Sequence, residues 1–164
     1  MEKDTKDITI SSIVIQQGNL NTVAWKEEQE KDEELKIVKQ WMDNGNAPTL
    51  EELKTKSIKL QRLGKLFQSI VIEPHSNALA IKTAEFEHPE MDNYRIIVPE
   101  HLKQDVIRRF HKSPQEGHFA TQITAKNVLN HFSVITPIAT VTRYITQCLE
   151  CQIKKKSIIH KIKP

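Results

Sequence analysis

The sequence contains only two cysteines in 164 residues, and it contains no long hydrophobic run. The two thiols, Cys148 and Cys151, lie three positions apart, which is too close to cross-link a secreted scaffold and well suited to sharing a metal ion. The N-terminus has no apolar stretch of secretory length, and no later segment approaches the ~20 apolar residues of a membrane span. We therefore expect a soluble, intracellular protein in a reducing compartment.

Composition and charge divide the chain into two parts. Hydrophobic residues make up 38%, enough for one ordinary domain or two small ones, and this argues against a disordered chain. Residues 1–98 carry 13 Lys and Arg against 17 Asp and Glu, a net charge of −4, whereas residues 99–164 carry 11 against 4, a net charge of +7. The basic part favours a polyanionic partner, with nucleic acid as the leading candidate, and lysines that merely solubilise the surface are the alternative.

Apolar periodicity and turn residues predict an α+β chain. In the N-terminal part, Asn44-Gly45 ends a first helix, and Thr49 with Glu52 forms a capping box that starts a second. We expect there a short strand at 8–15, helices at 26–43 and from 50 towards 63, a turn at 74–77, and strands of a small antiparallel sheet at 66–72, 78–83 and 94–98. The basic part is expected to form helices from Pro99-Glu100, near 121–132 and near 137–147, followed by a basic linker at 154–164.

Four residues of the basic part have the types and order of a metal site: His111, His118, Cys148 and Cys151. Two neutral imidazoles and two thiolates give Zn²⁺ a closed, neutral, tetrahedral shell, so we expect one structural zinc ion. A bundle this small needs such support. The alternatives are four unrelated residues, or a redox Cys-x-x-Cys, which would follow a strand at a helix N-terminus. His75, His88, His101, His131 and His160 have no partner at ligand spacing and are interpreted as ordinary polar residues.

The basic part also resembles a known family. The residues that carry the resemblance are Ile97, Val98, Pro99, His111, Pro114, Gly117, His118, Phe119, Thr124, Phe132, Tyr144, Ile145, Cys148, Cys151, Gln152 and Lys155. Over about residues 96–156 they are similar to the zinc-binding N-terminal domain of retroviral and gypsy-type retrotransposon integrases. Residues 20–95 resemble, more weakly, an N-terminal extension found in some of these integrases.

Two departures from that family pattern stand out. The family has Gly after His-Phe, where this chain has Ala120, and a Tyr-Trp-Pro-Gly run, where this chain has Ser133 to Thr136. The second change removes an aromatic side chain expected to pack on the zinc core, and Val134 and Ile135 are the expected substitutes. Such divergence is also typical of a domesticated element.

The resemblance implies a fold of two parts, a helix-plus-antiparallel-sheet N-terminal extension and a three-helix zinc-binding bundle. The expected domains are an N-terminal segment at 1–25, the extension at 26–98, the zinc domain at 99–153 and the basic linker at 154–164. Residues 99–153 are expected to depend on the metal for folding, and residues 1–98 are not.

The resemblance also implies a function. The parent protein would be a DNA integrase from a retroelement polyprotein, with a carboxylate catalytic core following about residue 164. We assign no catalysis to this chain, because its carboxylates, such as those of Glu27 to Glu34, are interpreted as solvated helix faces. The chain is expected to support multimer assembly and to bind element-end DNA without sequence specificity, in cytoplasmic particles and then in the nucleus. The expected phosphate contacts are Arg108, Arg109, Lys112, Lys126, Arg143, Lys154, Lys155 and Lys156. The alternative is a domesticated cellular scaffold for protein interaction or DNA binding.

Overall fold

The structure is a computed structural model, and it describes residues 20–84, 92–113 and 117–162. The strand expected at 8–15 and residues 163 and 164 of the expected linker lie outside these ranges. Within them, no helix combines the length and the apolar character needed to cross a bilayer.

The N-terminal helices are shorter and more numerous than the sequence predicts. They are η1 (Leu20–Thr22), α2 (Trp25–Glu30), α3 (Glu33–Asn44), α4 (Leu50–Lys54) and α5 (Ile58–Lys65). The single helix expected at 26–43 is wrong, because the Asp32 side chain accepts hydrogen bonds from the backbone N–H groups of Glu34 and Leu35 and so starts a new helix, α3. The end of α3 at Gly45, which has a φ of 68°, is confirmed.

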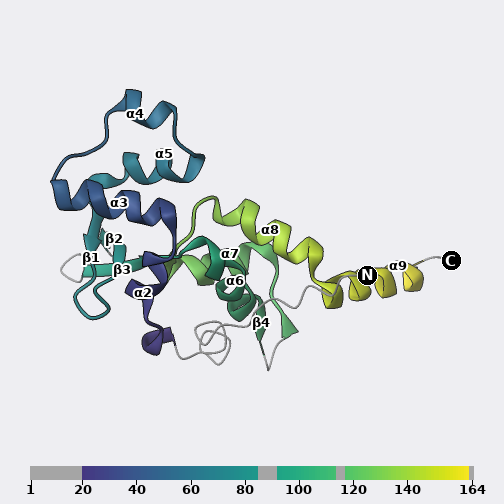
Figure 1. Cartoon of the computed structure of the whole chain (residues 1–164). Coiled ribbons are helices and arrows are strands. Elements are labelled where there is room, and N and C mark those ends of the chain that lie inside the picture. Colours follow the sequence, from purple (N-terminus) through teal and green to yellow (C-terminus); the bar gives the residue numbers. More distant parts are fainter. Residues whose placement is uncertain (1–19, 85–91, 114–116, 163–164) are drawn as a thin grey trace.

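The second expected helix is also divided. The capping box of Thr49 and Glu52 is confirmed at the start of α4. Ser57 then accepts a hydrogen bond from the backbone N–H of Leu60, which caps α5 as a separate helix. In the view of Figure 1 both helices lie above α3, and the strands lie below it.

The sheet has four strands in the order β1-β2-β3-β6. Its first three strands are β1 (Ile70–Ile72), β2 (Leu79–Ala84) and β3 (Asp92–Ile97), and their antiparallel pairing is confirmed. The strand expected from Leu66 begins later, because η2 (Phe67–Ser69) forms a 3₁₀ turn ahead of it. The fourth strand, β6 (Phe132–Ser133), comes from the basic part of the chain and pairs parallel to β3. The prediction of a purely antiparallel sheet therefore missed this fourth, parallel strand.

The basic part forms the expected helices and one more. Its elements are η3 (Glu100–Leu102), α6 (Lys103–His111), β4 (Lys112–Ser113), β5 (Gly117–His118), α7 (Thr121–Leu129), α8 (Pro137–Gln147) and α9 (Leu149–Ile162). The expected linker continues as α9, a helix that projects from the other elements (Figure 1). Residues 149–162 contain no Gly or Pro to stop it. The α+β class is confirmed.

Two large hydrophobic cores hold the elements together. One lies between α3, α5 and the sheet and includes Leu35, Leu63 and Ile97. The other is shared by the acidic and basic parts and consists of Val23, Trp25, Ala78, Val98, Leu102, Val106, Val128, Phe132 and Val134. In it, the rings of Trp25 and Phe132 lie 5.2 Å apart. The zinc-binding segment therefore packs directly on the N-terminal extension.

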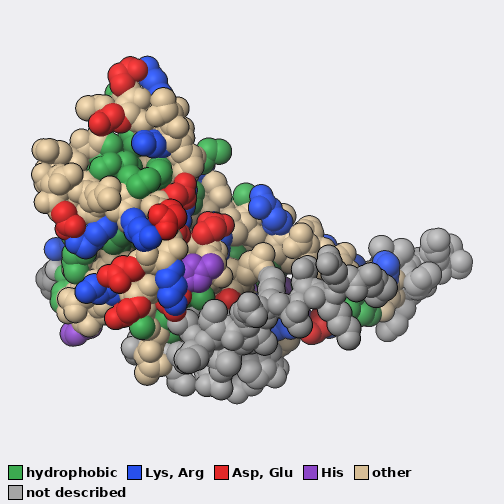
Figure 2. Space-filling model, viewed as in Figure 1, with side chains coloured by type: hydrophobic (Ala, Val, Ile, Leu, Met, Phe, Trp, Pro, Cys, Tyr) green, Lys and Arg blue, Asp and Glu red, His purple; other side chains and the backbone are tan. Residues whose placement is uncertain are grey.

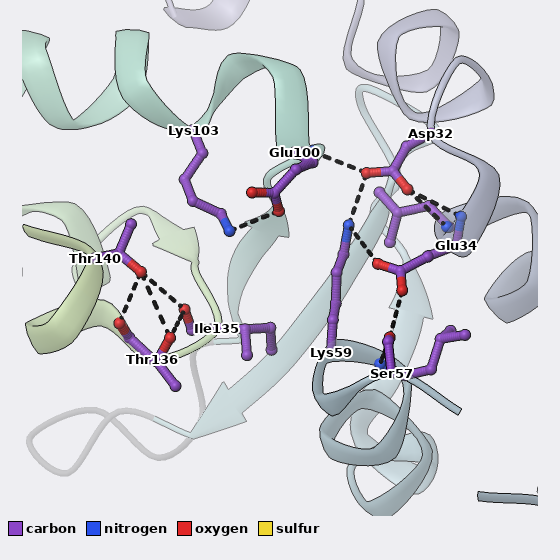
Figure 3. A network of polar contacts seen from close by, with 11 residues as sticks. Asp32, Glu34, Ser57, Lys59, Glu100, Lys103, Ile135, Thr136 and Thr140 are labelled. Atoms are coloured by element: carbon purple, nitrogen blue, oxygen red, sulfur yellow. Dashed lines mark hydrogen bonds and ion pairs between the residues drawn. The ribbon is translucent and has the colours of Figure 1, made fainter. Parts of the chain in front are cut away.

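A buried carboxylate joins three elements at this junction (Figure 3). The second oxygen of Asp32 accepts hydrogen bonds from Lys59 Nζ in α5 at 2.7 Å and from the backbone N–H of Glu100 in η3 at 2.8 Å. Burial raises the pKa of Asp32, but the hydrogen bonds from Lys59 and Glu100 outweigh it, so that the pKa is lowered overall. Asp32 is therefore ionised and links α3 to both neighbours.

A buried amide extends the sheet at the same junction. The last β2–β3 pair on this side is Ala80 with Ile96. At the next step Gln29 of α2 inserts its side chain: Nε2 donates to the carbonyls of Leu79 at 2.9 Å and Ile97 at 2.8 Å, and Oε1 accepts from the Leu79 N–H at 2.7 Å. The Gln29 carboxamide thus satisfies backbone groups that no strand pairs there.

Candidate metal centre

Four different elements bring the predicted ligands together. His111 is the last residue of α6, His118 lies in β5, Cys148 is the C-cap of α8, and Cys151 lies in the first turn of α9. Strands β4 and β5 pair so that Lys112 lies opposite His118, which returns the chain to the end of α6. The chain passes Gly117 with a φ of 83°, a conformation that favours glycine.

The side chains of these residues converge on one point. Cys151 Sγ lies 3.3 Å from His111 Nε2, and His118 Nδ1 lies 3.3 Å from the sulfur atoms of both Cys148 and Cys151. The four ligand atoms all lie within 4.8 Å of one another. A tetrahedral zinc ion with Zn–S of ~2.3 Å and Zn–N of ~2.0 Å requires N···S separations of about 3.5 Å. The donor set and its spacing therefore fit zinc.

Each imidazole has its other nitrogen held by an acceptor. His111 Nδ1 lies 2.9 Å from the carbonyl oxygen of Phe119, and His118 Nε2 lies 2.6 Å from Glu150 Oε2. Lys112 Nζ approaches the other oxygen of Glu150 at 3.2 Å. The pKa of Glu150 is lowered, chiefly by the hydrogen bond from Lys112 and then by the positive charge of that residue.

Burial shifts the pKa values of two of the ligands, His111 and Cys151. His111 is fully buried, and this burial, followed by the repulsion of His118, lowers its pKa, which favours the neutral imidazole that binds metals. Burial likewise raises the pKa of the Cys151 thiol. A divalent cation between two thiolates offsets the cost of their buried charge.

An aromatic ring packs against the site, and it does not come from the segment 133–136 where the family has one. Tyr144 of α8 meets the His111 ring edge to face at 5.6 Å, beside a small cluster of Ile107, Ala125 and Val141. Val134 instead joins the core shared with the N-terminal extension, and Ile135 packs on the core under α3. Val134 thus packs with Val106 and Val128 of the zinc-binding helices, whereas Ile135 does not pack on the zinc core as predicted, because β6 directs this segment into the sheet.

The remaining histidines are not part of the site. Among the described residues, the His₂Cys₂ set is the group whose spacing suits a metal ion. His101 Nε2 lies 2.7 Å from the buried Glu28, and His131 stacks on Phe110 with ring centres 5.9 Å apart. His75 lies in the turn between β1 and β2 and donates its backbone N–H to Glu73. His88 and the side chain of His160 lie outside the described residues.

The Cys-x-x-Cys pair has one feature of the redox alternative. Cys151 lies at the N-terminal end of α9, but the motif follows α8 rather than a strand. Both cysteines are free thiols facing imidazole nitrogens. This setting is that of a metal ligand pair.

The predicted phosphate contacts have different surroundings. Arg108 and Arg109 in α6 are half-buried, and Arg108 Nε donates to the hydroxyl of Tyr144 at 3.4 Å, whereas Lys112 pairs with Glu150. The other five are exposed: Lys126 on α7, Arg143 on α8, and Lys154, Lys155 and Lys156 on α9.

This geometry defines the class of protein module: a small helical unit built around one structural His₂Cys₂ zinc ion. Residues 98–157 match the family model of the integrase zinc binding domain, and all four ligand residues lie within the matched segment. A search of the curated proteins and a search of the solved structures found no match.

The sequence-based prediction missed the groups that surround the ligands. Glu150, the carbonyl of Phe119 and the ring of Tyr144 all contact a ligand imidazole. For Glu150 a signal was present, since a carboxylate between the two cysteines must lie close to whatever they bind. A backbone carbonyl leaves no such signal.

Proposed function

We propose that the chain serves as the zinc-binding N-terminal module of a retroelement DNA integrase, where it binds the DNA ends of the element and supports assembly of the multimer. The family match over residues 98–157 and the His₂Cys₂ centre support the integrase part of this proposal. Strand transfer is assigned to the parent protein, and we assign no catalytic step to the described residues. The module would act in cytoplasmic particles before integration and in the nucleus during it.

The proposal of DNA binding is supported by the difference in ion pairing between the acidic and the basic parts of the chain. In the acidic part, five lysines pair with carboxylates: Lys31, Lys36, Lys39, Lys54 and Lys59. Lys and Arg side chains lie beside Asp and Glu over its helices (Figure 2). By contrast, no carboxylate of the described residues pairs with Lys126, Arg143 or the lysines at 154–156. Their charges remain available to neutralise phosphates.

The test is a salt titration of binding between the zinc-loaded full chain and a short DNA duplex. If four of these five cations neutralise phosphates, log affinity should fall against log salt with a slope of about −4. Consecutive helical positions differ by about 100°, so Lys154, Lys155 and Lys156 do not all face one side. Replacing all three by Gln should therefore flatten the slope by about two units.

A matched control changes the same amount of charge in the acidic part. Replacing Lys36, Lys39 and Lys54 by Gln removes three cations that already pair with carboxylates, and the slope should stay unchanged. Equal flattening by both triple variants would mean that only net charge matters. Binding that does not depend on salt, or no binding at low salt, would contradict the proposal.

Exposed apolar side chains on α9 support the assembly part. Leu149 is 72% exposed and Ile153 is 54% exposed, one helical turn apart on the same face. Ile153→Ser should lower the self-association constant measured by sedimentation velocity. Ile58→Ser on α5, which is 67% exposed, is the matched control and should leave it unchanged. A chain that self-associates through α9 but does not bind DNA would favour the second candidate, a domesticated scaffold for protein interaction.

A further inference from the structure

The two ligand histidines use opposite ring nitrogens. His111 presents Nε2 to the thiol of Cys151, whereas His118 presents Nδ1 to both thiols. A neutral imidazole carries one proton, so the nitrogen that binds a metal must be the one without it. His111 therefore needs its proton on Nδ1, and His118 needs its proton on Nε2.

The acceptors match these two requirements. The Phe119 carbonyl lies 2.9 Å from His111 Nδ1, and Glu150 Oε2 lies 2.6 Å from His118 Nε2. Both oxygens can only accept a hydrogen bond, which the ring nitrogen must donate from an N–H group, so each oxygen selects the tautomer that its histidine needs. The acceptor for His111 belongs to the backbone, but the acceptor for His118 is a side chain that mutation can remove.

The position of Glu150 also excludes a role as a zinc ligand. Its carboxylate faces Nε2, the nitrogen of His118 that does not face the thiols, so it does not serve as a fifth ligand. Lys112 Nζ lies 3.2 Å from Glu150 Oε1 and balances its charge. The inner shell of one Zn²⁺ and two thiolates is neutral, and the Lys112–Glu150 pair keeps the surrounding shell neutral as well.

We propose that Glu150 is a positioning residue for the zinc ion, which holds His118 in the tautomer protonated at Nε2 and directs the Nδ1 lone pair to the metal. Loss of such an outer partner typically costs 10- to 100-fold in metal affinity. The Glu150 side chain is 59% exposed and that of His118 is 7% exposed. Because water can reach Glu150 and take its place in part, we expect the lower end of this range.

The experiment uses the full chain and measures zinc affinity by competition with a chromophoric chelator at one fixed pH. Glu150→Ala should weaken zinc binding about ten-fold, and Glu150→Gln should lose less, because the Gln carboxamide oxygen still accepts the hydrogen bond. The matched control is Glu51→Ala, which removes an exposed carboxylate paired with Lys54 on α4 and should leave the affinity unchanged.

A second measurement reports the tautomer directly. Long-range ¹H–¹⁵N correlation spectra of the zinc-loaded chain should show His118 protonated at Nε2, with slow exchange of that proton in the wild type and faster exchange in Glu150→Ala. A zinc affinity of Glu150→Ala within about two-fold of wild type, well short of the usual loss, would overturn the proposal. Protonation of His118 at Nδ1 would do the same. If Glu150→Ala does not fold with zinc, the wild-type spectrum decides: slow exchange of a proton on His118 Nε2 supports the proposal, and fast exchange of that proton overturns it.

Discussion

Replacement of Gln29 by Leu tests how α2 is joined to the sheet. Gln29 is 5% exposed and makes three hydrogen bonds to the backbone of Leu79 and Ile97. Leu nearly fills the same volume, so the change removes the bonds without a large cavity. Each bond contributes about 0.5–1.5 kcal/mol net, and backbone groups left buried without a partner add to the loss. The expected decrease in the free energy of unfolding is about 3 to 5 kcal/mol.

Urea unfolding of the zinc-loaded full chain, followed by far-ultraviolet circular dichroism, measures this loss. With a slope of about 2 kcal/mol per M, the midpoint should fall by about 2 M urea at an unchanged slope. Gln40→Leu makes the same substitution at an exposed position of α3, and the free energy of unfolding should change by less than about 0.5 kcal/mol. A loss of under about 1 kcal/mol for Gln29→Leu would refute the reasoning, because it would mean that water replaces the three bonds.

Two further predictions follow from the core shared by the two parts and from the buried carboxylate. The sequence alone led us to expect that residues 1–98 fold independently of the metal, but Trp25 packs on both β3 and the zinc-binding segment. Removal of zinc, or Cys148→Ser, should therefore speed hydrogen exchange in β3 as well as in the zinc-binding segment. As a control, His131→Ala changes an exposed histidine and should leave hydrogen exchange unchanged. Hydrogen exchange in β3 that is equally slow with and without zinc would contradict this coupling. The pKa of Asp32 is lowered on folding, so its contribution to stability is present above its unfolded pKa of about 3.9 and is lost as pH falls through the folded pKa. Asp32→Asn should therefore flatten the acid limb of the unfolding midpoint against pH, and an acid limb as steep as that of the wild type would contradict the assignment.

Local signals in the sequence predicted local structure well. Gly45, Thr49 and Glu52 act through neighbours within a few residues, and their helix boundaries are confirmed. The ligand set could be predicted for a different reason, since few combinations of residue types satisfy zinc. The breaks at Asp32 and Ser57 were missed although both residues are common helix caps, because the apolar periodicity continues across them.

Features that depend on distant partners were not predictable from one sequence. The parallel pairing of β6 with β3 joins residues more than thirty positions apart, and the two-residue strand β6 has no alternation of its own. Gln29 is a polar residue in a charged helix, so the sequence predicts that it is exposed to solvent. It is buried because its carboxamide bonds to the backbone where the β2–β3 pairing ends. The role of Glu150 depends on which nitrogen of His118 faces the thiols, and this is a property of three-dimensional geometry.

Because Trp25 of the N-terminal extension and Phe132 of the zinc-binding segment share one core, we expect zinc binding to stabilise both parts of the fold. A ligand that binds only the folded state adds RT ln(1 + [L]/Kd) to stability, about 2.7 kcal/mol when its free concentration is 100 times Kd. The folded population of the sheet would then follow the zinc buffering of the cell. Linkage is reciprocal, so a substitution at Trp25, which contacts no ligand, would weaken the apparent zinc affinity by destabilising the state that binds it. Substitutions in the core of the N-terminal extension would therefore change the apparent zinc affinity even though they lie outside the metal site.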